Sequence, residues 1–131
     1  MDKQHKVTRE HFEQFVDYCK TFIAAFGLHD WQTVYFHSMP DPHDTALACV
    51  EIPTVQGKIA QIALNTVWPD KVTDERLRMT AAHEVLHLLL ADITCTALYT
   101  EELASATRRA LTTAEHAAIN RLLPHILKAV Q

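Results

Sequence analysis

Apolar residues recur every three or four positions between residues 12 and 26, a spacing that predicts an amphipathic helix. The apolar set is Phe12, Phe15, Val16, Cys19, Phe22, Ile23 and Phe26. Thr8 can accept a hydrogen bond from a free amide at the start of this helix, and Gly27 is a typical stop at its end. We expect the helix to form one wall of the core and to carry no catalytic group.

The pattern changes to short, strand-like runs over residues 31–37, 45–52 and 58–66, which are rich in β-branched, aromatic and alternating apolar side chains. A loop containing Pro40 and Pro42 separates the first two runs, and residues 53–57 connect the last two as a hairpin. Residues 59–65 lie nearest in sequence to the following helix. We therefore expect them to form an edge strand that holds an extended peptide.

A second helix is predicted from about Asp74 to about Ala91. Thr73 can cap its first turn, and the acidic residues that follow favour the positive end of the helix dipole. Between residues 85 and 90 this helix is apolar almost all round, which indicates a buried helix. The polar residues within this stretch or directly before it are His83, Glu84 and His87.

The sequence His-Glu-x-x-His at residues 83–87 is the pattern of a catalytic zinc site. His83 and His87 lie one helical turn apart on the same face, so both imidazoles can bind one ion. Glu84 beside them can take a proton from water. The alternative is two core histidines bonded to backbone carbonyls, with Glu84 in an ion pair. Three polar groups in one buried turn are costly without a shared partner, so zinc-dependent hydrolysis is the leading prediction.

A catalytic zinc site needs a third protein ligand. Asp92 would point to the opposite side of a continuing helix. Glu101 and Glu102 have another explanation, because acidic residues are common in the first turn of a helix. Glu115 interrupts an apolar stripe of helical period and is the favoured ligand. A competing interpretation is that Thr112 and Glu115 form a capping box at the start of a new helix.

Composition limits the function further. The chain has 131 residues, a net charge of −4 and no block of like charges, so nucleic acid is not implied as a partner. Three isolated cysteines without a C-x-x-C motif are typical of reduced thiols in the cytoplasm. No apolar run reaches the length of a membrane span, and the first residues do not form a signal peptide. We expect a cytoplasmic protein that does not associate with membranes.

The predicted elements give a single α+β domain. It consists of an N-terminal helix, a small sheet of about three strands, the His-Glu-x-x-His helix and C-terminal helices that deliver the third ligand. His116 and Tyr99 are weaker candidates for stabilising an oxyanion.

The segments Ala81–Ala91 and Glu115–Leu122, with the order of elements ahead of them, resemble the small zincin-like metallopeptidases often encoded by phages and prophages. The resemblance implies one zincin-like metallopeptidase domain over residues 1–131 that cleaves a peptide or protein substrate. It further implies Zn²⁺ bound by His83, His87 and Glu115, with Glu84 as the general base. The alternative function is a non-catalytic, zinc-stabilised module that binds another protein.

Overall fold

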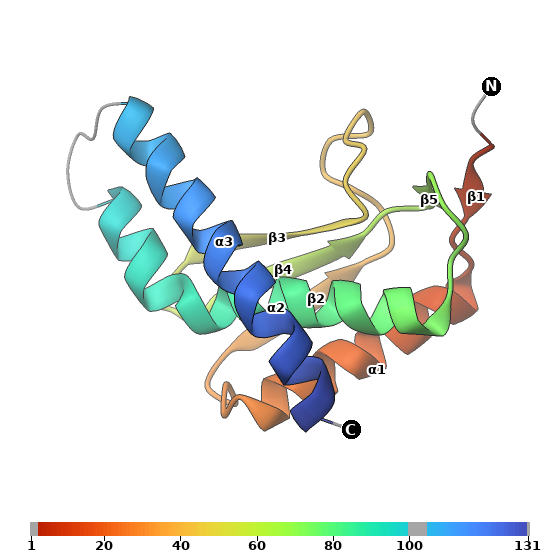
Figure 1. Ribbon diagram of the computed structural model, residues 1–131, viewed down its shortest axis with the longest axis horizontal. Helices are drawn as coiled ribbons and strands as arrows, with labels where there is room; N and C mark the ends of the chain where they lie inside the picture. Colours follow the sequence, from red (N-terminus) through yellow and green to blue (C-terminus); the bar gives the residue numbers. More distant parts are fainter. Residues whose placement is uncertain (1–2, 100–104, 131) are drawn as a thin grey trace.

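The computed structural model describes residues 3–99 and 105–130. In chain order the elements are β1 (His5–Lys6), α1 (Arg9–Ala25), β2 (Gln32–Phe36), β3 (Ala48–Thr54), β4 (Ile59–Leu64), β5 (Val67–Trp68), α2 (Asp74–Tyr99) and α3 (Ser105–Ala129). Helix α2 contacts α1, α3 and the sheet, and α3 crosses it obliquely (Figure 1). This arrangement confirms the α+β class. In the described part of the chain, none of the helices combines the length and apolar character needed to span a membrane.

Helix α1 begins and ends where its sequence predicts. The Thr8 hydroxyl accepts a hydrogen bond from the His11 amide at 3.1 Å, and the Thr8 amide donates to His11 Nδ1 at 3.0 Å. His11 thus completes a capping box, a role usually taken by Glu or Gln. Gly27 has φ of 69°, the left-handed conformation that ends many helices. The buried face comprises Phe15, Cys19 and Phe22.

The three-stranded sheet has the order β2-β4-β3. Strand β3 pairs antiparallel with β4 as a hairpin, as predicted, and β2 pairs parallel with β4. Strand β4 is therefore central, and the prediction that residues 59–65 form an edge strand is wrong. Both of its edges already carry hydrogen-bonded neighbours, so it cannot pair with a peptide. In the described residues β3 pairs with β4 alone, which makes β3 an edge strand on the side of α2.

A second sheet was not predicted, because its strands have only two residues each and show no period. It pairs β1 with β5 in antiparallel register, with His5 opposite Trp68. Trp68 is buried in the core, as expected, and its indole N–H donates to the Leu47 carbonyl at 3.1 Å. This bond connects β5 of the two-stranded sheet to the loop that precedes β3.

Helix α2 starts at Asp74 as predicted and continues to Tyr99, beyond the expected end at Ala91. No glycine or proline lies between residues 91 and 99, so nothing in the sequence stops the helix there. The Asp74 carboxylate accepts a hydrogen bond from the Tyr18 hydroxyl at 2.6 Å and fixes α2 against α1. The core-facing residues of α2 are Leu77, Ala81, Ala82, Val85, Leu86, Leu88 and Ala91.

Helix α3 is continuous from Ser105 to Ala129. Thr112 lies inside it, and its hydroxyl donates to the Arg108 carbonyl one turn earlier at 3.1 Å. The capping-box interpretation of Thr112 and Glu115 is therefore wrong, because the helix has already formed before Thr112. Ile119 and Leu123 face the core.

The end of α3 is fixed to α2 by Arg78. Its guanidinium donates to the Leu127 carbonyl at 2.8 Å and also to the Val130 carbonyl. These carbonyls belong to the last turn of α3 and the residue after it, where backbone acceptors lack helical partners. The contact sets how α3 lies across α2, and thereby which residues of α3 meet the His-Glu-x-x-His turn.

Candidate metal centre

Three imidazoles meet where α3 crosses α2. His83 and His87 lie one turn apart on α2, and His116 reaches them from α3. The ring centroids are 5.2 Å apart for His83 and His87, 5.8 Å for His83 and His116, and 5.0 Å for His87 and His116. One nitrogen from each ring lies within 4.8 Å of the other two. The chain therefore contains a cluster of three histidines that can hold a metal ion.

The spacing of the rings fits zinc. Tetrahedral zinc binds imidazole nitrogens at about 2.0–2.1 Å, which places the nitrogens about 3.4 Å apart and the ring centroids about 5 Å apart. The observed centroid distances of 5.0–5.8 Å are close to this value. Rotations of the side chains by small angles would bring the nitrogens into range. Imidazole is also a ligand that zinc commonly has in proteins.

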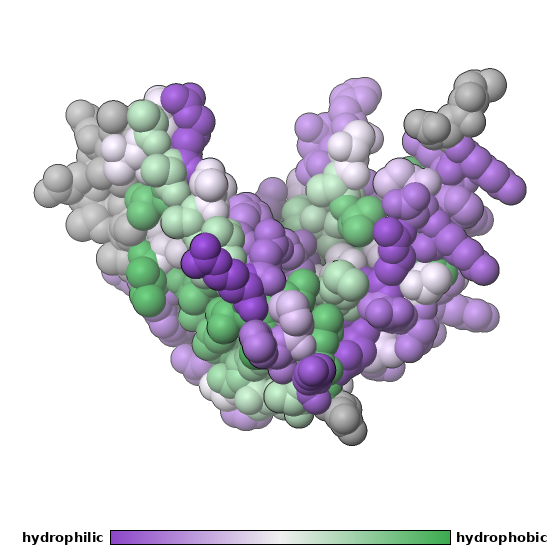
Figure 2. All heavy atoms as spheres, in the orientation of Figure 1, coloured by the Kyte–Doolittle hydropathy of each residue, from purple (hydrophilic) through white to green (hydrophobic). Residues whose placement is uncertain are grey.

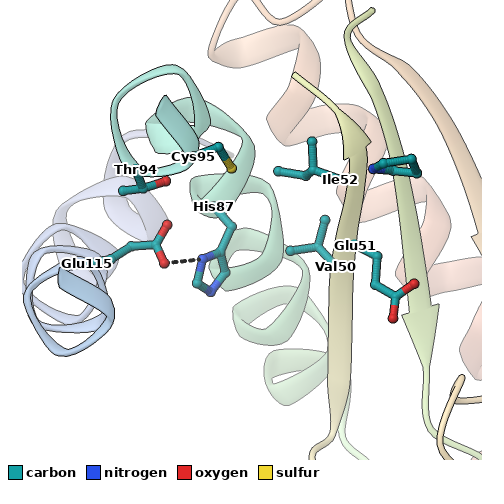
Figure 3. A pocket seen from close by; sticks show the side chains of 8 residues that line it. Val50, Glu51, Ile52, His87, Thr94, Cys95 and Glu115 are labelled. Atoms are coloured by element: carbon teal, nitrogen blue, oxygen red, sulfur yellow. Dashed lines mark ion pairs between the residues drawn. The ribbon is translucent and has the colours of Figure 1, made fainter. Parts of the chain in front are cut away.

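Two of the three rings have a hydrogen-bond partner at Nδ1. His87 Nδ1 lies 3.2 Å from Glu115 Oε1, and both side chains are largely buried, with 14% and 13% exposed. Figure 3 shows the Glu115 carboxylate directed at this nitrogen. His116 Nδ1 lies 2.9 Å from the Thr112 carbonyl oxygen. Since a carbonyl can only accept, His116 carries its proton on Nδ1, which leaves a lone pair on Nε2 for a metal.

Burial keeps the rings on α2 neutral. It lowers the pKa of His83 to about 4, and the two neighbouring imidazoles act in the same direction. Burial also lowers the pKa of His87, although the Glu115 carboxylate opposes this shift. Neutral imidazole is the form that binds a metal, so these two rings need to release little or no proton to bind one near neutral pH.

Glu84 is a buried carboxyl group next to the cluster. It is 6% exposed, and burial raises its pKa to about 8, with the negative charge of Glu115 adding to the shift. It lines a cavity of about 320 Å³ together with His83 and Asn120. A bound cation would lower this pKa, because a nearby positive charge favours the carboxylate. A carboxyl group in such a position is suited to accept and release a proton near neutral pH.

The cluster lies between the edge strand and the two helices. A second cavity, of about 540 Å³, is lined by residues 50–53 of β3 on one side and by His87, Cys95 and Glu115 on the other. The cavity beside Glu84 is lined by Ala48 at the start of the same strand. In the space-filling view, the surface is hollowed between the loop that precedes β3 and the side formed by the end of α2 and the start of α3 (Figure 2). Successive residues of β3 thus lie along both sides of the cluster.

The structure brings together His83, Glu84 and His87, as the local spacing predicts. Glu115 also reaches this site, but it contacts the Nδ1 side of His87, and its role as a metal ligand stays a prediction. Asp92 lies away from the cluster and accepts hydrogen bonds from Lys58 Nζ at 2.8 and 3.0 Å.

Other predicted residues have different outcomes. Glu101, Glu102 and the side chain of Tyr99 lie outside the described residues. From the sequence, His116 is a candidate only for stabilising an oxyanion, and its place beside His83 and His87 is not predicted. The signal was its position directly after Glu115, on the helix expected to supply the third ligand.

Comparisons of the chain with protein-family models, with curated proteins and with solved structures found no match. The resemblance to zincins therefore rests on the residues of the site and the order of the elements around it.

Proposed function

We propose that the protein is a zinc-dependent metallopeptidase that hydrolyses peptide bonds with Glu84 as the general base. The observation that supports this most strongly is the pairing of a buried, proton-accepting carboxyl group with three convergent imidazoles. Sites that only stabilise a fold with zinc have four protein ligands and no need of a free carboxyl group beside them. Here the described residues offer three ligands, and Glu84 lies next to them.

In the proposed reaction, the zinc ion and the residues of the chain have different roles. Zinc, when bound, lowers the pKa of water to about 7 and polarises a carbonyl group. Glu84 accepts the proton that the attacking water loses and delivers it to the nitrogen of the leaving amine. His83 and His87 hold the ion on the same turn of α2 that carries Glu84, so the base and the ion keep a constant separation. Packing of that turn against α1 and the sheet restricts its movement.

The edge strand supports a peptide as the substrate class. Strand β3 lies beside the cluster and has unpaired backbone groups on its outer side within the described chain. An extended peptide can pair with such an edge and present one of its carbonyl groups to the metal centre. Val50 and Ile52 point toward His87, and Glu51 points away (Figure 3). The substrate side chains nearest the cluster would thus meet an apolar wall.

The test is hydrolysis by the chain loaded with one equivalent of zinc. An unfolded protein such as reduced casein is the substrate, and new amino termini are identified by mass spectrometry. We expect cleavage by the unaltered chain. Glu84→Gln should keep zinc and lower the rate by about 10²–10⁴-fold, the usual contribution of a general base. Glu75→Gln, an exposed glutamate on the same helix, is the control and should cleave normally.

Two results would contradict the proposal. Equal cleavage by Glu84→Gln would exclude Glu84 as the base. A chain that binds zinc and cleaves none of a broad set of peptides would not be a peptidase, and that result would favour the zinc-stabilised module that binds another protein.

A further inference from the structure

We infer that the third ligand is His116 and that Glu115 is a positioning residue, which holds the His87 ring through Nδ1 without binding the ion. The inference rests on the proposed function only in taking the metal to be zinc. It assigns different roles to two adjacent residues of α3. The grounds are the hydrogen bonds of the His87 and His116 rings and the side of His87 on which Glu115 lies.

Glu115 contacts the Nδ1 side of the His87 ring. Its Oε1 lies 3.2 Å from His87 Nδ1. The two nitrogens of an imidazole point in nearly opposite directions, so an ion on Nε2 lies on the far side of the ring from this carboxylate. With a zinc to nitrogen distance of about 2 Å, the ion would be roughly 7 Å from the bonded oxygen. The carboxylate cannot keep this hydrogen bond and also bind an ion held by Nε2.

His116 has a hydrogen bond that orients its ring and leaves Nε2 free. Its Nδ1 donates to the Thr112 carbonyl at 2.9 Å, and its ring lies 5.0 Å from that of His87. The bond to the carbonyl selects the tautomer whose Nε2 lone pair is free. Histidine ligands of zinc usually donate the other ring N–H to a carboxylate or a backbone carbonyl. His87 and His116 show one case of each, with Glu115 and Thr112 as the partners.

The rival assignment, with Glu115 as the ligand, requires a different arrangement. Glu115 would have to leave His87 and swing toward the ion, and His87 Nδ1 would lose its partner in a largely buried position. His116 would then lie beside the ion without a role, although its ring is within the same cluster. The observed hydrogen bonds favour three imidazoles around the metal and one carboxylate behind them.

The test combines the ligand count with zinc affinity. X-ray absorption at the zinc edge, on the unaltered chain with one equivalent of zinc, should show three imidazoles and no carboxylate from the chain. Zinc affinity is then measured by competition with a chelator for four variants: Glu115→Gln, Glu115→Ala, His116→Ala and His125→Ala. His125 is an exposed histidine of α3 and serves as the control. Far-ultraviolet circular dichroism reports whether each variant is folded.

The expected results separate a positioning residue from a ligand. Glu115→Ala should bind zinc about 10–100-fold more weakly, the usual effect of losing an outer partner of a ligand. Glu115→Gln keeps an oxygen that accepts from His87 Nδ1, so its affinity should stay closer to that of the unaltered chain. His116→Ala should lose more affinity than Glu115→Ala and show one imidazole fewer at the zinc edge. His125→Ala should bind normally.

Several outcomes would overturn the inference. Two imidazoles with one carboxylate, or equal losses for Glu115→Gln and Glu115→Ala, would make Glu115 the ligand. The ligand count on the unaltered chain decides this even if a variant fails to fold. Cleavage of peptides by a chain with two imidazoles and a carboxylate would overturn the inference and leave the proposed function intact. Three imidazoles without cleavage would support the inference and contradict the proposed function. A chain that binds no zinc would contradict both.

Discussion

Glu84 should control how the stability of the metal-free chain changes with pH above neutrality. Its pKa is 4.5 in the unfolded chain and about 8 in the folded one, because burial disfavours the charged carboxylate. The folded state therefore holds a proton that the unfolded state has lost. The contribution of this group to stability is complete below pH 4.5 and is lost as pH rises to about 8.

His83 acts in the opposite direction and in a different range. Its pKa is 6.5 when unfolded and about 4 when folded, so its contribution is complete above pH 6.5 and is lost as pH falls toward 4. The lowered pKa of His87 has the same sign. Burial raises the pKa of the Cys19 and Cys49 thiols, so these do not ionise in the folded chain below pH 8. Because unfolded histidines are still half protonated at pH 6.5, these groups also act between pH 6.5 and 8. The difference between the unaltered chain and Glu84→Gln over this interval isolates Glu84.

The size of the effect follows from the two pKa values of Glu84. Each pH unit in which one proton separates the two states changes the free energy of unfolding by about 1.4 kcal/mol. Between pH 6.5 and 8 the total is about 1.5 kcal/mol, allowing for partial ionisation near the upper end. Urea unfolding followed by tryptophan fluorescence, with a chelator present, measures this at both pH values. Over this interval the unaltered chain should lose about 1.5 kcal/mol of stability relative to Glu84→Gln.

Glu75→Gln is the matched control, because Glu75 is exposed on the first turn of the same helix. It should follow the unaltered chain. If the unaltered chain and Glu84→Gln change in parallel between pH 6.5 and 8, Glu84 does not hold a proton in the folded state. The interpretation of Glu84 as a proton acceptor tuned by burial would then be wrong.

Three further predictions concern the core, the metal and α3. Leu86→Ala should lower the free energy of unfolding by about 2–5 kcal/mol in urea, because the Leu86 side chain is fully buried in the core. Zinc at a hundredfold excess over its dissociation constant should stabilise the chain by about 2.7 kcal/mol and so raise its melting temperature. At the same zinc concentration, the rise in melting temperature should be much smaller in His87→Ala. Arg78→Met should destabilise the chain by about 1–3 kcal/mol, because it removes the donor to the Leu127 carbonyl. Amides in the last turns of α3 should then exchange hydrogen faster.

The part of the site that depends on one helix could be predicted from the sequence. The spacing of His83 and His87 places them on one face of any helix, and their apolar surroundings predict the burial of Glu84. The position of His116 beside these two rings could not be predicted in this way. It depends on the angle and height at which α3 crosses α2, which the contacts of Arg78 with the end of α3 help to set.

The three-stranded sheet could also be predicted from the sequence only in part. Local alternation and the turn at residues 53–57 predict the hairpin of β3 and β4. The edge strand depends on a pairing between segments distant in sequence, because β2 pairs with β4 and leaves β3 on the outside. Strand periodicity carries no information about that choice. The edge strand beside α2 is therefore β3, and the sequence suggests β4 instead.

The most direct test of the metal centre is the zinc content of the chain purified without added metal, measured together with that of a His83→Ala, His87→Ala double variant. Both proteins are checked for folding by circular dichroism, and His125→Ala controls for loss of an exposed histidine. We predict near one zinc per chain for the unaltered protein and for the control, and almost none for the double variant. A folded, unaltered chain without zinc, or equal zinc in the double variant, would contradict a metal centre at His83 and His87.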